Sequence, residues 1–462
     1  MTMRSWQGKN VLILGAARQG IATLRFLLKN GVNVTINDQK SAIDFQELEQ
    51  EFADQNVHWE FGSHPLSLLD KIEIVIVSGG ISLELPIIQE AYKRGIIITN
   101  DSQIFMEAVK AKVIGITGSS GKTTTTVLVG EIARAAAHPD QKVWVGGNIG
   151  YPLIDHLDEI KSTDLVVTEL SSFQLELMNI SPHIAAVLNI TPNHLDRHVN
   201  MQAYIQAKSQ ILLHQSISDI AVLNCEDKNT MGLMEKVKGG LITFGLGKSI
   251  DGYTGTVLKQ EKLVIQSSKE QIEIMPRSEI QLKGEHNLVN ALAACAIGFA
   301  AEFPMRAIRE GILQVKGIPH RLEFVREWRG TFWYNDSIAT APERTMAAIL
   351  SFNQPLVLLL GGRDKKLPWD NLVNLIHQRV KNVILFGESA ELIARALGET
   401  RSNQFPLTIT RCTTLENAVK IAADHAEKGD AVVLSPGGTS YDEFRDFEER
   451  GQRFKEWVMT LP

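Results

Sequence analysis

Short apolar runs alternate with amphipathic segments along the first 110 residues. From Asn10 the chain reads NVLILGAARQGIATLRFLLKNGVNVTINDQK, which predicts a buried strand, a glycine turn, an amphipathic helix and a second strand ending in an acidic residue. EIVIVSGG and GIIITND predict further strands, with helical patterns between them. Strands that alternate with helices indicate a parallel, Rossmann-like sheet.

The same alternation returns twice further along the chain. KVIGIT, DLVVTEL, IAAVLNI and DIAVLN predict a second α/β sheet, and PLVLLLGG, NVILFG and DAVVLSPGG predict a third. Between Gly239 and Leu282 the short alternating runs YTGTVLK, KLVIQSS and QIEIMP predict hairpins added to the second sheet, which the helix EHNLVNALAACAIGFAAE closes. We therefore expect three α/β domains, at residues 1–110, 111–318 and 319–462.

Composition narrows the class of protein. A net charge of −6 gives no overall reason to bind nucleic acid or an anionic membrane. The longest apolar stretch, ALAACAIGFAA, is shorter than the ~18 residues of a spanning helix, and no signal peptide is evident at the N-terminus. The three cysteines (Cys225, Cys295, Cys412) lie far apart, which argues against a disulfide framework or a structural zinc site. These features favour a cytoplasmic protein.

The segment ITGSSGKTTTT is the strongest chemical motif. It follows the strand KVIGIT and precedes the helix TTTTVLVGEIARAAA, so unpaired backbone N–H groups and the helix dipole favour an anion there. Gly118 and Gly121 allow the backbone to curl around a phosphate, Lys122 adds charge, and Thr123 offers a hydroxyl to Mg²⁺. The full P-loop pattern fails, because Ile116 stands where a glycine is required. A plain Gly/Ser turn with a solvated lysine is the alternative.

The shorter spacing TGSSGKT resembles the ATP loop of the Mur ligase and folylpolyglutamate synthetase superfamily. Further motifs of that family follow in order over essentially the whole chain: GGNIG, ELSSFQLE, NITPNHLDRH, AYIQAK, GEHNLVNALAA, PHRLE, NDSIATAPERT and LSPGGTSYDEFRDFEERG. SSFQLE and the C-terminal motif are most similar to those of members that join D-glutamate to UDP-N-acetylmuramoyl-L-alanine. The resemblance implies an ATP-dependent amide ligase that forms an acyl phosphate during peptidoglycan precursor synthesis.

The resemblance also implies a catalytic centre with ATP and two Mg²⁺ ions. ATP would lie on the loop Gly118, Ser119, Ser120, Gly121, Lys122, Thr123 and Thr124. Thr123, Glu169 and His194 would bind Mg²⁺, and Lys208 would act as a carbamylated metal ligand; Lys122, His194 and Lys208 would be catalytic. From the residues alone, Glu169 and Lys208 could equally be surface charges, and His194, Asp196 and His198 could be a zinc-type cluster or solvated side chains.

The remaining ATP and amino-acid contacts are implied in the same way. Asn287 and Asn290, three apart on one helix face, would bind adenine, although they could equally satisfy nearby backbone. Arg321 and Asp336 would reach the phosphates and the ribose. Thr340, Lys365, Ser435 and Tyr441 would bind the incoming amino acid. This chain departs from the family pattern at Ile338, where a lysine is usual after Asp-Ser.

The N-terminal turn GAARQG is open to two interpretations. Ala17 stands where the dinucleotide fingerprint needs its middle glycine, and Asp38 follows near the expected place of a ribose-binding acid. Alone, this weakly suggests an NAD-dependent dehydrogenase, or only a glycine turn of the fold. The resemblance instead implies that Gly15, Asp38, Ser78 and Gly80 bind the UDP part of the substrate, with Asn148 and Ser171 as further substrate contacts.

Two other functions stay open from the sequence. One is a sister ligase that adds a different amino acid to a UDP-muramoyl substrate. The other is a protein that binds nucleotide or UDP-sugar without catalysis. For any of these we expect a monomer.

Overall fold

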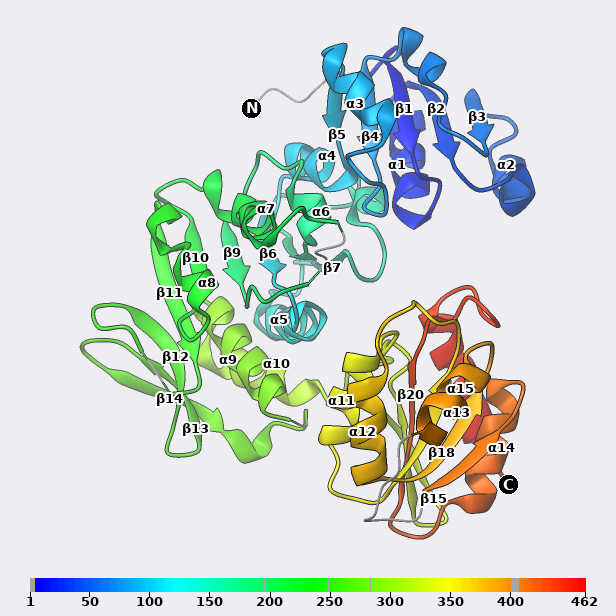
Figure 1. Cartoon of the computed structure of the whole chain (residues 1–462). Coiled ribbons are helices and arrows are strands. Elements are labelled where there is room, and N and C mark those ends of the chain that lie inside the picture. The colour runs from blue at the N-terminus through cyan, green and yellow to red at the C-terminus, as the bar shows by residue number, and fades with distance from the viewer. Residues whose placement is uncertain (1–4, 194–196, 248, 283, 400–406) are drawn as a thin grey trace. The chain divides into compact units, whose positions relative to one another are not determined.

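The computed structural model describes residues 5–193, 197–247, 249–282, 284–399 and 407–462. They form two compact units: residues 1–280 with 285–315, and residues 281–284 with 316–462. The first unit holds a five-stranded and a nine-stranded sheet, and the second holds a six-stranded sheet (Figure 1). The α/β class expected from the alternating pattern is confirmed in all three sheets.

The N-terminal sheet is entirely parallel, with strand order β3-β2-β1-β4-β5. Alternate residues of the central strand β1 face opposite sides: Val11 and Ile13 pack against α1, and Leu12 and Leu14 pack against α3. Its elements are β1 (Asn10–Leu14), α1 (Arg18–Lys29), β2 (Asn33–Asp38), α2 (Gln46–Glu51), β3 (Val57–Phe61), β4 (Ile74–Val77), α3 (Pro86–Lys93), β5 (Ile97–Thr99) and α4 (Asp101–Ala108).

Strand order reverses beside β1 in this sheet, because the chain runs first to β2 and β3 and then back to β4 and β5. In open parallel sheets the ligand crevice lies at the carboxyl ends of the strands at such a reversal. The turns after β1 and β4, which start at Gly15 and Ser78, lie at that place. The predicted UDP-binding turns thus occupy the crevice position of the fold.

The central sheet has the order β14-β13-β12-β11-β10-β9-β6-β8-β7. Strands β6 to β12 are parallel to their neighbours in this group. Strands β13 and β14 add antiparallel hairpins at one edge, as the alternating runs predict. The strands are β6 (Lys112–Thr117), β7 (Val143–Gly147), β8 (Leu165–Glu169), β9 (Ile184–Val187), β10 (Ile220–Asn224), β11 (Gly240–Gly245), β12 (Thr254–Lys259), β13 (Lys262–Gln266) and β14 (Gln271–Pro276).

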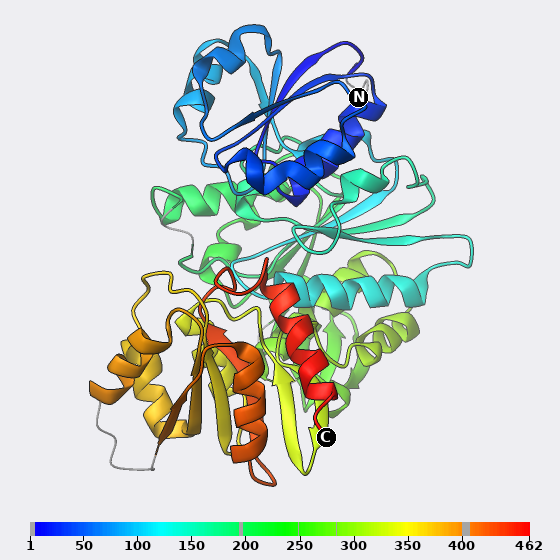
Figure 2. The same ribbon diagram turned by 90° about the vertical axis from the view of Figure 1, so that its right-hand side faces the viewer.

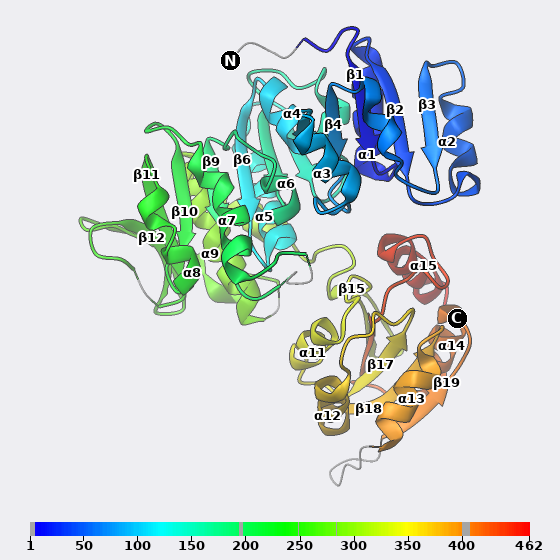
Figure 3. The same cartoon turned by 45° about the horizontal axis from the view of Figure 1, so that its top comes forward.

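Helices cover both faces of the central sheet. On one face, α7 packs Tyr204, Ile211 and Leu212 into a core with β6, β8, β9 and β10. Helices α5, α9 and α10 pack together on the other face, as the cyan and yellow-green ribbons show (Figures 2 and 3). The helices are α5 (Lys122–Ala136), α6 (Ser172–Leu175), α7 (Met201–Leu213), α8 (Lys228–Met231), α9 (Glu285–Ala300) and α10 (Met305–Gln314).

The C-terminal sheet has the order β15-β16-β20-β17-β18-β19, with only β15 antiparallel to its neighbour. In β17, Leu358 and Leu360 face α11, α12 and α13, whereas Val357 and Leu359 face α14 and α15. The elements are β15 (Glu323–Trp328), β16 (Thr331–Asn335), α11 (Pro342–Leu350), β17 (Leu356–Gly361), α12 (Asp370–Arg379), β18 (Val380–Phe386), α13 (Ala390–Glu399), β19 (Thr408–Arg411), α14 (Leu415–His425), β20 (Ala431–Gly437) and α15 (Phe447–Met459).

No helix in the described part of the chain combines the length and the apolar character needed to span a bilayer. The three cysteines are all free thiols.

Candidate active site

The loop between β6 and α5 is a tight bend with room for no side chain at either glycine. Gly121 has a φ of +79°, and a Cβ there would lie 2.3 Å from Asn290 Oδ1. A Cβ on Gly118 would lie 3.0 Å from Leu188 Cβ. The first hydrogen bond of α5 runs from Thr125 N to Gly121 O, so the preceding N–H groups have no acceptor within the helix. This geometry fits a phosphate cradle.

A neighbouring segment holds the first half of this loop in shape. Ser119 N donates to Asn189 O (2.9 Å), and Ser120 N donates to Asn189 Oδ1 (2.9 Å). Ser119 Oγ donates to Thr191 O (2.9 Å). Thr124 is fully buried in α5, and its hydroxyl has no hydrogen-bond partner in the described structure. The hydrogen bonds to Asn189 and Thr191 hold the loop in this shape by contacts within the protein alone.

Two lysines converge on the same carbonyl of the loop. Lys122 Nζ and Lys208 Nζ each lie 2.9 Å from Gly118 O, and Lys208 Nζ is also 3.3 Å from Thr117 Oγ1. Lys208 is only 1% exposed, so its interpretation as a surface lysine is wrong. Burial, then the charge of Lys122, lowers the pKa of Lys208 well below its usual value, against the opposing effect of Glu169.

Glu169 ends β8 beside the loop and is also 1% exposed, so the surface-charge interpretation is wrong here too. Its Oε2 accepts a hydrogen bond from Thr123 Oγ1 (2.9 Å), and its Oε1 accepts one from Asn148 Nδ2 (2.8 Å). A hydroxyl and a carboxylate in contact are the hard oxygen donors that Mg²⁺ prefers. These residues fit a magnesium ion.

The predicted histidine cluster is only partly visible. His194 and Asp196 lie outside the described residues. His198 is buried, with Nδ1 3.2 Å from Glu176 Oε1 and Nε2 3.0 Å from Ser172 Oγ, so it is not a solvated side chain. Among the described residues, no three His, Cys, Asp or Glu side chains form a metal-type group.

Ser171 and the two asparagines predicted to bind adenine belong to the same unit as the loop. Ser171 caps α6, and its side chain exchanges hydrogen bonds with Gln174. Asn287 and Asn290 are both buried on α9, with Asn290 Nδ2 donating to Asn287 Oδ1 (3.2 Å). Because Asn290 lies against Gly121, the structure brings the pair to the loop.

The four predicted UDP-site residues lie around the crevice of the N-terminal sheet. Gly15 has a φ of +96°, and its carbonyl accepts a hydrogen bond from Ser78 Oγ (3.1 Å). Asp38 Oδ2 accepts a hydrogen bond from Ala16 N (2.8 Å), so this carboxylate caps the turn. Gly80 O accepts a hydrogen bond from Arg197 Nη1 (2.9 Å).

In the second unit, Arg321 stands between two residues in left-handed backbone conformations, His320 (φ +61°) and Leu322 (φ +43°). Such strain needs support from the surrounding structure. Asp336 supplies part of it, because its Oδ1 accepts a hydrogen bond from Leu322 N (3.2 Å) and its Oδ2 accepts one from Ser435 Oγ (2.8 Å). Burial raises the pKa of Asp336 to about 7.

The residues predicted to bind the amino acid differ in their surroundings. Lys365 Nζ lies 3.3 Å from Thr340 Oγ1, so these two side chains meet. Ser435 is fully buried and faces Asp336. Tyr441 is 62% exposed, and the structure gives it no contact with the others.

Models of known protein families match residues in all three sheets. The Mur ligase MurD-like N-terminal domain matches residues 9–100, the Mur ligase middle domain matches 116–298, and the Mur ligase glutamate ligase domain matches 320–438. The chain belongs to the Mur ligase family. As a Mur ligase it is an amide-bond-forming enzyme that uses ATP.

Two similar full-length relatives carry the same enzyme name. UDP-N-acetylmuramoylalanine–D-glutamate ligase of Symbiobacterium thermophilum is 38% identical over 449 residues, covering 97% of each chain. The enzyme of that name from Acetivibrio thermocellus is 37% identical, covering 98% of this chain and 97% of its own. The solved UDP-N-acetylmuramate–alanine ligase of Thermotoga maritima covers 98% of this chain and 99% of its own, with a TM-score of 0.61 and 18% identity, which shows the shared fold.

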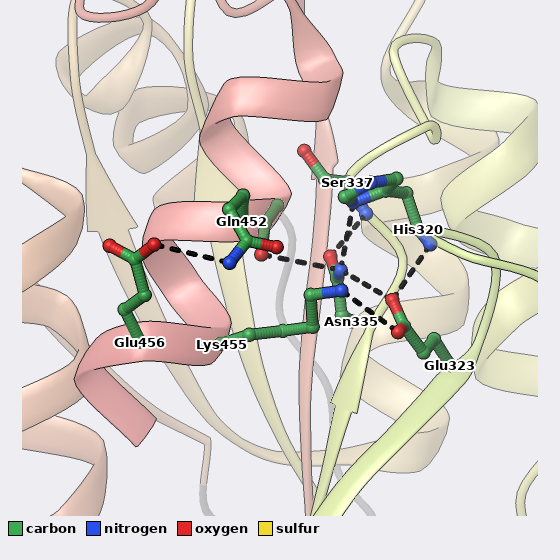
Figure 4. A network of polar contacts seen from close by, with 8 residues as sticks. His320, Glu323, Asn335, Ser337, Gln452, Lys455 and Glu456 are labelled. Atoms are coloured by element: carbon green, nitrogen blue, oxygen red, sulfur yellow. Dashed lines mark hydrogen bonds and ion pairs between the residues drawn. The ribbon is translucent and has the colours of Figure 1, made fainter. Parts of the chain in front are cut away.

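A polar network around the buried side chain of Asn335 supports the strained Arg321 segment of this Mur ligase (Figure 4). Asn335 Nδ2 lies 3.0 Å from both His320 Nδ1 and Glu323 Oε2, and Glu323 Oε2 also accepts a hydrogen bond from His320 N (2.9 Å). Lys455 of α15 donates to Glu323 Oε1 (3.0 Å). The segment is thus held from β15, β16 and α15 together.

Three arginines of this Mur ligase contact predicted site residues or the segments beside them, although sequence reasoning did not single them out. Arg450 is fully buried and donates to Ser337 O (2.9 Å) and Gly438 O (3.1 Å). Arg197 reaches the turn after β4. Arg344 Nη1 donates to Ile338 O (3.2 Å). All three lie inside quoted motifs, but only the fold shows what each guanidinium contacts.

Proposed function

We propose that this Mur ligase joins D-glutamate to UDP-N-acetylmuramoyl-L-alanine, with release of ADP and phosphate, in peptidoglycan precursor synthesis. The observation that carries the chemistry is the convergence of Lys122, Lys208, Thr123 and Glu169 on one preformed loop. The choice of D-glutamate rests on the full-length relatives of that name. We place the enzyme in the cytoplasm and expect it to act as a monomer.

The reaction must activate a carboxylate, which is a poor acyl donor. The γ-phosphoryl group of ATP passes to a carboxylate oxygen, and ADP leaves. The D-glutamate nitrogen, after losing a proton, attacks the acyl carbon and forms the C–N bond. The C–O bond to phosphate then breaks, and inorganic phosphate leaves with the electron pair.

The chain's own groups offset the negative charge that gathers during phosphoryl transfer. The N–H groups from Gly121 to Thr124, which precede the first hydrogen bond of α5, face the phosphates, and Lys122 places its ammonium charge beside the transferring group. Asn287 and Asn290 bind adenine, while Arg321 and Asp336 bind the phosphates and the ribose. Preorganisation by Asn189 and Thr191 keeps this cradle open without rearrangement.

Two magnesium positions fit the proposal. Thr123 and Glu169 would hold one ion, and His194 with carbamylated Lys208 would hold the other. Bound Mg²⁺ supplies Lewis-acid charge neutralisation between triphosphate and carboxylate. A carbamate on Lys208 replaces a buried cation, beside Lys122, with an anionic oxygen ligand.

The substrates occupy the remaining predicted positions. Gly15, Asp38, Ser78 and Gly80 bind the UDP moiety, and Asn148 and Ser171 contact the muramoyl-alanine portion. Thr340, Lys365, Ser435 and Tyr441 bind D-glutamate.

A panel of amines tests the proposed specificity. Purified protein with ATP, Mg²⁺ and UDP-N-acetylmuramoyl-L-alanine is offered D-glutamate, L-lysine, diaminopimelate or L-alanine in separate assays of phosphate release. We expect release with D-glutamate alone. Release with another amine and not with D-glutamate would identify a sister ligase. Binding of nucleotide without ADP formation under any condition would overturn catalysis altogether.

A further inference from the structure

Two cations are anchored to one short stretch of the second unit. Arg344, near the start of α11, donates from Nη1 to Ile338 O (3.2 Å). Lys365, in the turn after β17, donates from Nζ to Thr340 Oγ1 (3.3 Å). Thr340 N also donates to Ile338 O (2.9 Å), so both cations border the same three residues.

Neither cation has an ion-pair partner among the described side chains, although the charge of Arg344 acts on Asp336 from further away. Within the described ranges, no acidic side chain lies within the ion-pair distance of 4.0 Å of Arg344 or Lys365. The adjacent Arg363 differs, because both of its terminal contacts go to Glu388 at 2.9 Å. The nearby carboxylate of Asp336 is buried, and its two oxygens accept hydrogen bonds from Leu322 N and Ser435 Oγ.

The two positive charges also disfavour one another. Partial desolvation, then the charges of Arg344 and Arg450, lowers the pKa of Lys365. Arg450 is occupied with the backbone of Ser337 and Gly438, whereas Arg344 and Lys365 keep donors unused by acidic groups. An anion placed between them would relieve the repulsion and accept those hydrogen bonds.

The position is that of a ligand crevice. β16 and β17 flank β20 in the parallel part of the sheet, and the segments after β16 and β17 leave from its carboxyl edge. Ile338 contributes an aliphatic side chain there and no charge. The positive charge facing this stretch therefore comes from α11 and from the turn after β17.

We propose that Arg344 is a specificity-determining residue that, with Lys365, binds the two carboxylates of the incoming amino acid. This inference rests on the proposed function and deepens it, since D-glutamate is a dicarboxylate and needs two such partners. The planar guanidinium of Arg344 can grip one carboxylate through two parallel hydrogen bonds, which a lysine cannot do.

The test compares substrate constants for Arg344→Ala and Arg344→Lys. We expect the KM for D-glutamate to rise about 10- to 100-fold in Arg344→Ala, the loss typical of a hydrogen bond to a charged group. Arg344→Lys should lose less. The KM values for ATP and for UDP-N-acetylmuramoyl-L-alanine should stay within about twofold. Arg395→Ala, which removes an exposed arginine paired with Glu391 on α13, is the matched control.

A second variant restores a positive charge at position 338 in the protein that lacks the Arg344 guanidinium. Ile338→Lys in the Arg344→Ala background should recover most of the lost affinity for D-glutamate. A D-glutamate KM unchanged by Arg344→Ala, or equal rises for all three substrates, would overturn the inference. So would a double variant no better than Arg344→Ala. These results presuppose a wild type that uses D-glutamate; a wild type that uses another amine would instead refute the proposed function.

Discussion

At the scale of single residues, burial separates functional charges from solvated ones. Glu169 and Lys208 look like ordinary charged residues in the sequence, yet each is almost fully enclosed beside the same loop. Burying a charge without a partner is costly, so such positions are retained where a ligand completes them. Glu169 and Lys208 are therefore candidates for binding a ligand beside this loop.

The first prediction concerns the carboxylate of Glu169. Glu169→Gln keeps the size and the contacts with Thr123 and Asn148 but removes the negative charge. We expect turnover to fall about 10²- to 10³-fold, as for removal of one transition-state stabilising group, and the Mg²⁺ concentration for half-maximal activity to rise. Phosphate release measured across a Mg²⁺ titration checks both. An unchanged Mg²⁺ dependence would argue against a metal ligand.

The second prediction follows from the raised pKa of Asp336, about 7 in the folded protein. Between about pH 4 and 7 the unfolded chain loses this proton while the folded protein keeps it, so the group's contribution to stability falls as pH rises. Asp336→Asn removes that titration. The variant should therefore gain stability relative to wild type, by about 1 kcal/mol or more, on going from pH 5 to pH 8.

Urea unfolding of both proteins across that pH range measures the difference. A difference in the free energy of unfolding that stays constant with pH would show that Asp336 is ionised at all these pH values.

Sequence reasoning found the residues of the loop because a strand, two glycines, a lysine and hydroxyls occur together in a few positions. It could not distinguish the buried state of Lys208, since a lysine within a helix reads as solvated until the packing of α7 is known. Ser435 illustrates the same limit: the motif gives its position, and only the fold shows that its hydroxyl faces Asp336.

At the scale of elements, α15 supports the strained segment that carries Arg321. Gly451 of this helix lies against the strained segment, where an added Cβ would fall 2.1 Å from His320 Nδ1 and 2.9 Å from Asn335 Nδ2. The helix also carries Lys455, which belongs to the network of Figure 4, and Arg450, which donates to Ser337 O. The backbone at Arg321 is therefore set in part by α15, more than 100 residues further along the chain.

The third prediction uses two helical glycines as a matched pair. Gly451→Ala should destabilise the protein by about 1–3 kcal/mol and raise the KM for ATP, because the methyl group displaces His320 and with it Arg321. Gly398→Ala on α13 meets nothing within 4 Å and should stabilise by about 0.5–1 kcal/mol. Thermal unfolding and ATP titrations separate the two. Equal behaviour of both variants would contradict this role of α15.

The strand pattern predicted those parallel strands that are continuous apolar runs, such as PLVLLLGG. It did not predict the parallel strands β3, β7, β11, β16 and β19, nor the antiparallel β15. The residues Glu323–Trp328 are only partly buried at the sheet edge, so their polar and aromatic mixture lacks a clear period.

At the scale of the whole molecule, side-chain contacts join the N-terminal sheet and its helices to α6 and the segment before α7. Arg197 Nη1 donates to Gly80 O (2.9 Å), Nη2 donates to Ile81 O, and the guanidinium lies 4.4 Å from the centre of the Phe173 ring on α6. Asn100 Nδ2 donates to Gln174 O (2.7 Å) at the same helix. This accounts for one compact unit where the sequence suggests two domains.

The fourth prediction is that Arg197 positions the turn after β4. Arg197→Ala should raise the KM for UDP-N-acetylmuramoyl-L-alanine about tenfold, with the affinity for an ATP analogue changed less than twofold. Lys29→Ala removes the exposed pair of Lys29 with Asp158, another contact between the same two sheets, and serves as the control. Steady-state kinetics and nucleotide titration provide the measurements. A loss confined to ATP binding would contradict the assignment.

The most direct test of the central claim is ADP formation by wild type and Lys122→Ala with UDP-N-acetylmuramoyl-L-alanine, D-glutamate and Mg²⁺ATP. If the loop between β6 and α5 grips the triphosphate for transfer to the carboxylate, wild type sustains ADP formation over many turnovers only when both co-substrates are present, because D-glutamate must consume the acyl phosphate. The variant then loses at least about 100-fold in turnover while its fold is retained. Near-normal ADP formation by Lys122→Ala would show that phosphoryl transfer takes place elsewhere.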